Sequence, residues 1–136
     1  MSSNDRDCNL TEMLRLYNDS LEQSSEYLKI LPEVMKEVYN LFVKEEIERS
    51  EAYLAWEEET DDPVLKSFYN SQREATEKQI NEAKRLLPED PEQAAQVFMQ
   101  LGSCHRLWDI QKTILKKKYG IIWYSPDELN PETIYD

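Results

Sequence analysis

The chain has 136 residues, of which 40% are hydrophobic and 32% charged, and its formal net charge is −12. This length is typical of one domain with a real core, and the numerous apolar residues argue against a wholly disordered chain. The negative charge disfavours direct contact with nucleic acid or with an anionic membrane surface. We therefore expect one soluble domain that has no nucleic-acid and no membrane partner.

The N-terminal residues and the cysteines indicate the compartment. Residues 1–7 lack the basic and apolar regions of a secretion signal, and no apolar run is long enough to span a membrane. Two cysteines, Cys8 and Cys104, are too few for a disulfide framework. We expect a cytoplasmic protein.

Glycine and proline divide the chain into helices. Only two glycines are present, which excludes Gly-rich phosphate loops and argues against a turn-rich β protein. Asn9, with Glu12 three residues later, is a capping-box start for a first helix over 10–31. Because a proline disfavours helical geometry in the residue before it, Pro32 predicts a break there and a second helix over 32–59.

Two Asp-Pro pairs predict the next helix starts. Asp62 and Asp90 each precede a proline, which is the pattern of an N-cap followed by a first-turn proline. They predict helices over 63–87 and 91–119, the last of which ends at Gly120 after a lysine-rich turn.

The residues after Gly120 form a different kind of segment. The run 121–124 is too apolar to be left in water, and Ser125 with Glu128 is expected to cap one helical turn. We predict an all-α fold: a four-helix up-and-down bundle-like domain over 1–120, with a short extended, turn-rich tail over 121–136 that packs back on the same domain.

One charged residue interrupts the predicted apolar face of the second helix. At 100° per residue, Glu45 projects from this face and Arg49 lies at its edge. The pair is interpreted either as an ordinary i,i+4 ion pair or, with His105 and Asp109, as part of a buried polar site. The face itself is expected to consist of Val34, Val38, Leu41, Phe42, Ala52 and Trp56.

Acidic residues are concentrated in the segment 45–62, which holds nine of them against Arg49 alone. Its net charge is therefore −8, and several acids crowd a helix C-terminus, where negative charge is unfavourable. The segment is either a solvated face or a docking patch for a basic surface. The residues predicted to bind a partner are Glu51, Glu57, Glu58, Glu59, Asp61 and Asp62.

Catalytic and metal sites find little support in the sequence. Cys104 and His105 are adjacent, so on a helix they diverge and the histidine does not serve as base to the thiol. A single histidine excludes the paired Glu-x-x-His motifs of di-iron bundles. We predict no catalytic residue, no metal site and no cofactor.

A short stretch, Leu31–Lys36, resembles the opening helix of the carboxymuconolactone decarboxylase family. In the peroxidase branch of that family, the resemblance implies a Cys-x-x-Cys motif with a nearby histidine. Residues 102–105 read Gly-Ser-Cys-His and lack the second cysteine. The resemblance therefore implies no activity here, and we assign the chain to no family.

The favoured function is a non-catalytic acidic interaction module that docks a basic protein, itself a candidate nucleic-acid binder, through the segment 45–62. Inhibitor, immunity-type and assembly-subunit roles all fit this description. The alternative is a small carboxylate-dependent metal-binding protein or enzyme with a site around Glu45. A homodimer is a further alternative, because Val43, Ile47 and Leu54 lie on the opposite side of the second helix.

Overall fold

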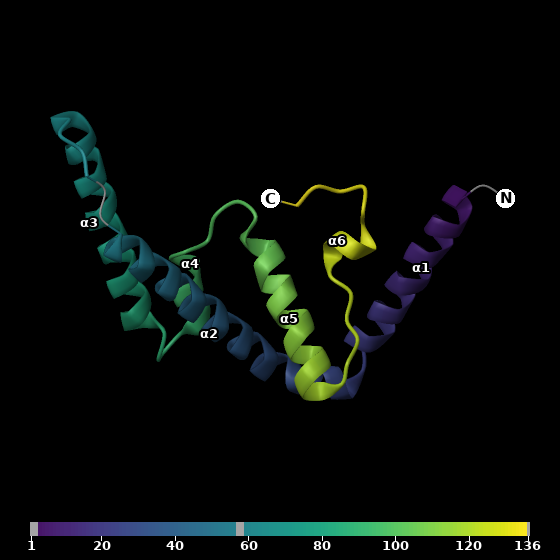
Figure 1. The fold of residues 1–136 in the computed structure, drawn as a ribbon. Coiled ribbons are helices and arrows are strands. Elements are labelled where there is room, and N and C mark those ends of the chain that lie inside the picture. The colour runs from purple at the N-terminus through teal and green to yellow at the C-terminus, as the bar shows by residue number, and fades with distance from the viewer. Residues whose placement is uncertain (1–2, 57–58, 136) are drawn as a thin grey trace. The chain divides into compact units, whose positions relative to one another are not determined.

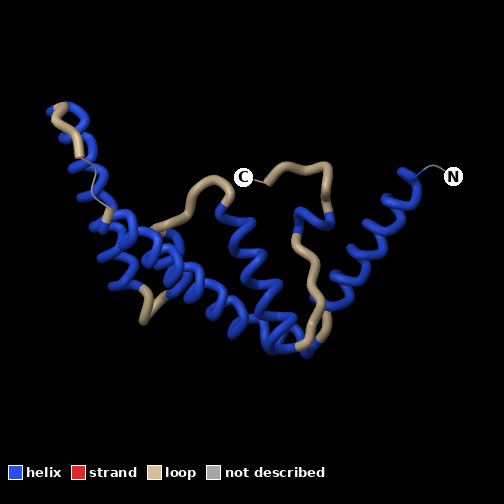
Figure 2. Tube along the Cα trace, viewed as in Figure 1, coloured by secondary structure: helices blue, strands red, loops and turns tan. Residues whose placement is uncertain are grey.

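The structure, a computed structural model, describes residues 3–56 and 59–135, and all regular structure in them is helical (Figures 1 and 2). The predicted all-α class is confirmed. The described residues form six helices rather than the predicted four: α1 Ser3–Glu22, α2 Ser25–Ala55, α3 Pro63–Leu86, α4 Pro91–Gln96, α5 Ser103–Tyr119 and α6 Pro126–Leu129.

The chain divides into two compact units. Unit 1 comprises residues 1–38 and 101–136, and unit 2 comprises residues 39–100. The long helix α2 contributes its first part to unit 1 and its second part to unit 2. Packing as an up-and-down four-helix bundle stays a prediction.

The first helix break lies earlier than predicted, at residues 23–24 instead of at Pro32. The Ser24 hydroxyl donates to the Leu21 carbonyl at 2.7 Å and accepts the Tyr27 backbone N–H at 3.2 Å. One serine therefore satisfies a carbonyl at the end of α1 and an amide at the start of α2. Pro32 lies inside α2, past its first two turns, and is exposed, so the helix tolerates the penalty of a proline there.

The predicted helix over 91–119 is also wrong, because the structure has two helices, α4 and α5, in this range. Gly102 precedes α5 with φ 85°, a left-handed conformation that glycine adopts without strain. Phe98, in the connection, is buried in unit 2. The connection between α4 and α5 therefore contains a buried aromatic residue, and α5 begins directly after Gly102.

The helix start predicted at Asn9 is wrong, because Asn9 lies inside α1, which begins at Ser3. The predicted caps at Asp62, Asp90 and Gly120 are confirmed. Asp62 accepts the Val64 backbone N–H at 2.9 Å and starts α3, and Asp90 accepts the Gln93 N–H at 3.1 Å and starts α4. Gly120, with φ 67°, ends α5 by donating to carbonyls of its last turn.

Unit 1 has a closed apolar core. Val34, Val38 and Leu115 are fully buried, and the Tyr27 hydroxyl hydrogen-bonds to the buried Gln111 side chain. Burial and nearby Glu22 raise the pKa of Tyr27, and the bond from Gln111 opposes them. The full set of buried core residues is Tyr27, Val34, Val38, Ile114, Leu115 and Trp123.

The segment after Gly120 is held to unit 1 by polar contacts as well as by Trp123. The buried Asn18 side chain donates to the Tyr124 carbonyl at 2.7 Å and accepts the Tyr124 N–H at 3.3 Å. The turn predicted after Ser125 is confirmed as α6, where Glu128 accepts the Ser125 backbone N–H at 3.3 Å.

The buried side chains of unit 2 are confined to one end of the hairpin formed by α2 and α3. They are Phe42, Val43, Glu46, Ile80, Ala83, Ala94, Ala95 and Phe98. From Ile47 to Gln79, by contrast, none of the described side chains is buried. The end of this hairpin that holds the α2–α3 connection is therefore open to solvent.

Candidate binding surface at the hairpin tip

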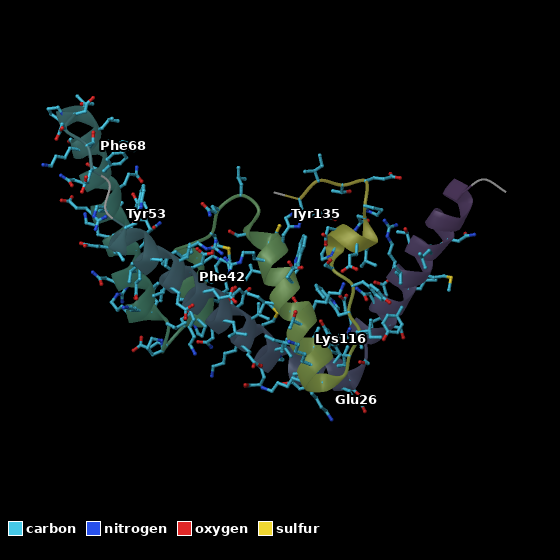
Figure 3. The ribbon with its side chains drawn as sticks, viewed as in Figure 1. Glu26, Phe42, Tyr53, Phe68, Lys116 and Tyr135 are labelled. Carbon is cyan, nitrogen blue, oxygen red and sulfur yellow. The ribbon has the colours of Figure 1, made fainter. Side chains whose placement is uncertain are left out.

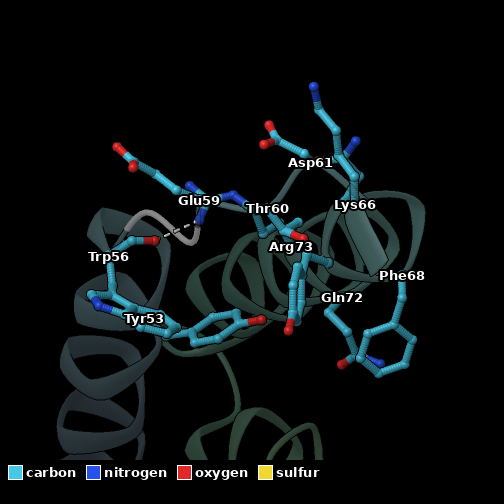
Figure 4. Close-up of a pocket in the computed structure, with 11 residues that line it drawn as sticks. Tyr53, Trp56, Glu59, Thr60, Asp61, Lys66, Phe68, Gln72 and Arg73 are labelled. Carbon is cyan, nitrogen blue, oxygen red and sulfur yellow. Dashed lines mark hydrogen bonds between the residues drawn. The ribbon is translucent and has the colours of Figure 1, made fainter. Parts of the chain in front are cut away.

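A cavity of about 770 Å³ lies where α2 ends and α3 begins (Figure 4). We call the described part of this region, residues 53–56 and 59–73, the hairpin tip. It combines aromatic rings, carboxylates, amides and two cations within unit 2. The lining residues are Tyr53, Trp56, Glu59, Thr60, Asp61, Lys66, Phe68, Tyr69, Asn70, Gln72 and Arg73.

Arg73 ties the two helices of the tip together. Its guanidinium donates to the Trp56 carbonyl at 2.9 Å (Figure 4). It also donates to the Leu54 carbonyl, in the last turn of α2. A cation is favourable beside the carbonyls that end a helix, and charge-assisted bonds are stronger than neutral ones. Arg73 therefore stabilises the carbonyl end of α2. Sequence reasoning missed it, because no local pattern links residues so far apart.

The predicted partner-binding acids divide into three groups. Glu51 forms a salt bridge with Lys84 at 3.0 Å, and Asp62 caps α3, so both have roles in the fold. Glu57 and Glu58 lie outside the described residues. Glu59 and Asp61 are exposed and line the cavity (Figure 4).

The aromatic residues of the tip were not predicted to be exposed. Trp56 was placed on the apolar face of the second helix, but it is 57% exposed. Phe68 is 55% exposed and Tyr53 38%, and both line the same cavity as Trp56 (Figures 3 and 4). Isolated exposed apolar residues are ordinary, but several around one cavity mark an interaction site.

The expected buried face of α2 is also corrected. Glu45 is exposed, and the buried carboxylate is that of Glu46, which lies 3.4 Å from the Arg49 guanidinium. Val34 and Val38 are buried in unit 1, whereas Phe42, Val43 and Glu46 are buried in unit 2. The side of α2 that is buried therefore differs between its two parts, because different elements cover them. A prediction that assumes one buried face along the whole helix misses this difference.

His105 has partners other than the predicted Asp109. Its Nε2 lies 2.7 Å from the Tyr135 carbonyl oxygen, and its Nδ1 lies 3.7 Å from an Asp127 carboxylate oxygen. The ring meets Trp108 edge to face, while Asp109 is exposed. These contacts attach the end of the chain to α5 in unit 1. Glu45 and Arg49 belong to unit 2.

Among the side chains that the structure describes, those of residues 9–56 and 59–135, no group of three or more His, Cys, Asp or Glu is arranged to hold a metal ion. In that same part of the chain, no helix has both the length and the apolar character needed to span a membrane.

Comparison with models of known protein families, with curated proteins and with solved structures found no match.

Proposed function

We propose that this protein is a non-catalytic acidic interaction module that docks a basic protein surface through its hairpin tip. One observation carries the proposal: exposed aromatic rings and exposed carboxylates line a single cavity within residues 53–56 and 59–73. Aromatic residues dominate the energetics of protein interfaces, and carboxylates select a basic partner.

The charge of unit 2 supports the same proposal. Residues 39–100 carry fifteen acidic and seven basic residues, a net −8 of the −12 of the whole chain. A surface of one sign attracts an oppositely charged partner over a distance of about one Debye length, roughly 10 Å at 0.1 M salt. We therefore expect binding to be fast at low salt and to weaken as salt is added.

The contacts at the tip indicate which of the acidic residues are candidates for docking the partner. Glu51 and Asp62 stabilise the fold through Lys84 and the start of α3, so changing them would test stability as much as binding. Glu59 and Asp61 lie at the cavity and are exposed. They are therefore the two acids that the proposal relies on.

Other parts of the proposal follow from the sequence alone. A cytoplasmic location, an up-and-down helix packing and an inhibitor, immunity-type or assembly-subunit role belong to it. The alternative function, a carboxylate-dependent metal protein around Glu45, gains no support from the described residues, because Glu45 is exposed.

The proposal is tested with an octa-lysine peptide as a defined basic probe. Binding is measured by calorimetry at about 10 mM ionic strength, where screening is weak. The wild type is compared with E59Q/D61N and with the control E74Q/E77Q, which changes the net charge equally at exposed sites of α3 that do not line the cavity.

We expect E59Q/D61N to bind the peptide about tenfold more weakly than the wild type, and E74Q/E77Q to lose about twofold or less. Unequal losses locate the docking at the tip, because the two variants have the same net charge. Equal losses would show that the probe responds only to overall charge, and would overturn the proposal.

A further inference from the structure

We infer that α1 pairs with α1 of a second copy of this chain, through an apolar stripe on the side of the helix that unit 1 leaves open. Four large apolar side chains of this one helix are about half exposed or more. They are Leu10 (55%), Met13 (65%), Leu16 (63%) and Tyr17 (47%). Scattered exposed apolar residues are ordinary, but a contiguous set of them marks an interaction surface.

Another side of α1 is held by the C-terminal segment of unit 1, where α6 lies beside it (Figure 1). The buried Asn18 side chain bonds both backbone groups of Tyr124. The Arg15 guanidinium donates to the Leu129 carbonyl at 3.0 Å. The rings of Tyr17 and Tyr124 meet edge to face, with their centroids 6.0 Å apart. These contacts fix α1 in place, so the stripe lies on a helix that is already positioned.

The apolar spacing of α1 is that of a helix pair. Intervals of four, three and four residues, the heptad spacing of a seam between two helices, separate Leu10, Leu14, Tyr17 and Leu21. Within unit 1 this seam is only partly covered. Leu14 and Leu21 are half-buried, whereas Leu10 and Tyr17 are exposed. The open part of the seam therefore has room for a second helix.

Charge favours a second copy as the partner. At 100° per residue, Glu12, Arg15 and Asp19 lie together on one side of α1. The arc that holds the stripe carries no charged residue between Asn9 and Leu21. Two copies of a chain with a net charge of −12 repel each other, so an uncharged apolar face is where they can meet with their acids apart. A basic partner gains nothing from a face that has no acids.

The stripe is also complementary to itself. Leu10 and Tyr17 lie equally far along the helix from a point between Met13 and Leu14. Two such helices can run antiparallel about a two-fold axis through that point. Leu10 of one copy then meets Tyr17 of the second copy, and Met13 meets Leu14, so that each contact occurs twice. The antiparallel arrangement also opposes the two helix dipoles favourably.

This dimer face differs from the one predicted from the sequence. That prediction relied on Val43, which is fully buried in unit 2 and is therefore not free to contact a second copy. A single helix pair is smaller than a standard interface of roughly 800 Å² per partner. We therefore expect a weak dimer, with a Kd on the order of 100 µM.

The test is sedimentation velocity of the wild type from about 10 µM to about 500 µM, on both sides of the expected Kd. The variant L10Q/M13Q makes two members of the stripe polar with a good helix former. The matched control is L101Q/I134Q, because Leu101 and Ile134 are 84% and 86% exposed and lie outside α1. Circular dichroism checks that both variants keep their helices. Each series is run at about 0.05 M and about 0.5 M NaCl.

We expect the wild type and L101Q/I134Q to pass from monomer to dimer over this range with the same Kd, and L10Q/M13Q to associate about tenfold more weakly or less. Dimerisation should strengthen at the higher salt concentration, because screening reduces the repulsion between two acidic chains. Binding of the octa-lysine peptide should weaken over the same change, so the two surfaces respond to salt in opposite directions.

A wild type that stays monomeric at about 500 µM in about 0.5 M NaCl would overturn the inference. A dimer that L10Q/M13Q forms as readily as the wild type, or one that the control variant abolishes, would overturn it too, because another surface would then join the two copies. These outcomes leave the hairpin tip untouched, since the peptide titration of E59Q/D61N tests that surface separately.

Discussion

The core of unit 1 and the hairpin tip of unit 2 differ in the burial of their apolar side chains. In unit 1, Tyr27, Leu115 and Trp123 come from three separate segments of the chain and are all buried. At the tip, Trp56 after the end of α2 and Phe68 in α3 line the same cavity, and both remain more than half exposed. The first set stabilises the fold, whereas the second set is available for contact with another molecule.

The two regions also use their charges differently. In unit 1, Lys118 pairs with Glu37 at 3.1 Å and Lys112 with Glu128 at 2.6 Å, so carboxylates attach one element to another. At the tip, Glu59 and Asp61 are exposed and line the same cavity as the exposed rings. The charged residues of unit 1 therefore link elements of the fold. Exposed carboxylates that line a cavity together with exposed rings are typical of a binding surface.

Truncation of a core residue gives the largest expected effect. Leu115→Ala should lower the free energy of unfolding by about 3 kcal/mol, because it removes fully buried methyl groups and leaves a cavity. The matched tip variant Trp56→Ala should change it by no more than about 0.5 kcal/mol. Urea denaturation followed by circular dichroism measures both. Similar losses in the two variants would contradict the contrast between the regions.

An intermediate effect is expected at Asn18, which holds the C-terminal segment of unit 1. Asn18→Ala should cost about 1–3 kcal/mol, because the Tyr124 backbone loses both hydrogen bonds from a buried partner. The same denaturation experiment measures the loss, and Asp19→Ala, at an exposed neighbouring position, serves as control. A cost no larger than that of the control would show that the segment is held without Asn18.

A smaller effect is expected from pH at α6. The Ser125 hydroxyl lowers the pKa of Asp127; at Glu128 burial raises the pKa, but the bonds from Lys112 and Ser125 outweigh it. Both folded-state pKa values therefore lie below the ordinary carboxyl values of about 4. Their stabilisation is present above those values and is lost as pH falls through the folded-state pKa.

The check is to measure the free energy of unfolding between about pH 6 and pH 3 for the wild type and Glu128→Gln. A glutamine can still cap α6 but carries no charge to titrate. We expect the variant to lose less stability on acidification than the wild type. Identical pH profiles would show that Glu128 is not stabilised by Lys112.

Local signals predicted much of the fold. The helix starts at Asp62 and Asp90 and the stop at Gly120 follow from side-chain caps and glycine geometry within a few residues. The break at Gly102 was missed, although a glycine in the middle of a predicted helix was a usable signal. The break was predicted at Pro32 and not at Ser24, because a proline is a strong local signal, whereas the Ser24 side chain satisfies groups of both α1 and α2 only once the two helices are formed.

The candidate site was predicted only in part. The acidic composition of 45–62 was visible in the sequence, and it led to Glu59 and Asp61. The exposure of Trp56 and Phe68 was not, because burial depends on which elements cover each part of a helix. The contact of Arg73 with the end of α2 likewise depends on how the two helices pair.

The most direct test of the docking surface is a titration of the isotopically labelled protein with the octa-lysine peptide, followed by backbone amide NMR. Our account predicts that the largest shifts fall within residues 53–56 and 59–73, together with the indole N–H signal of Trp56. The amides of the unit 1 core, such as those of Leu115 and Trp123, should stay in place. Shifts spread evenly over all exposed acidic positions, or concentrated in unit 1, would contradict it.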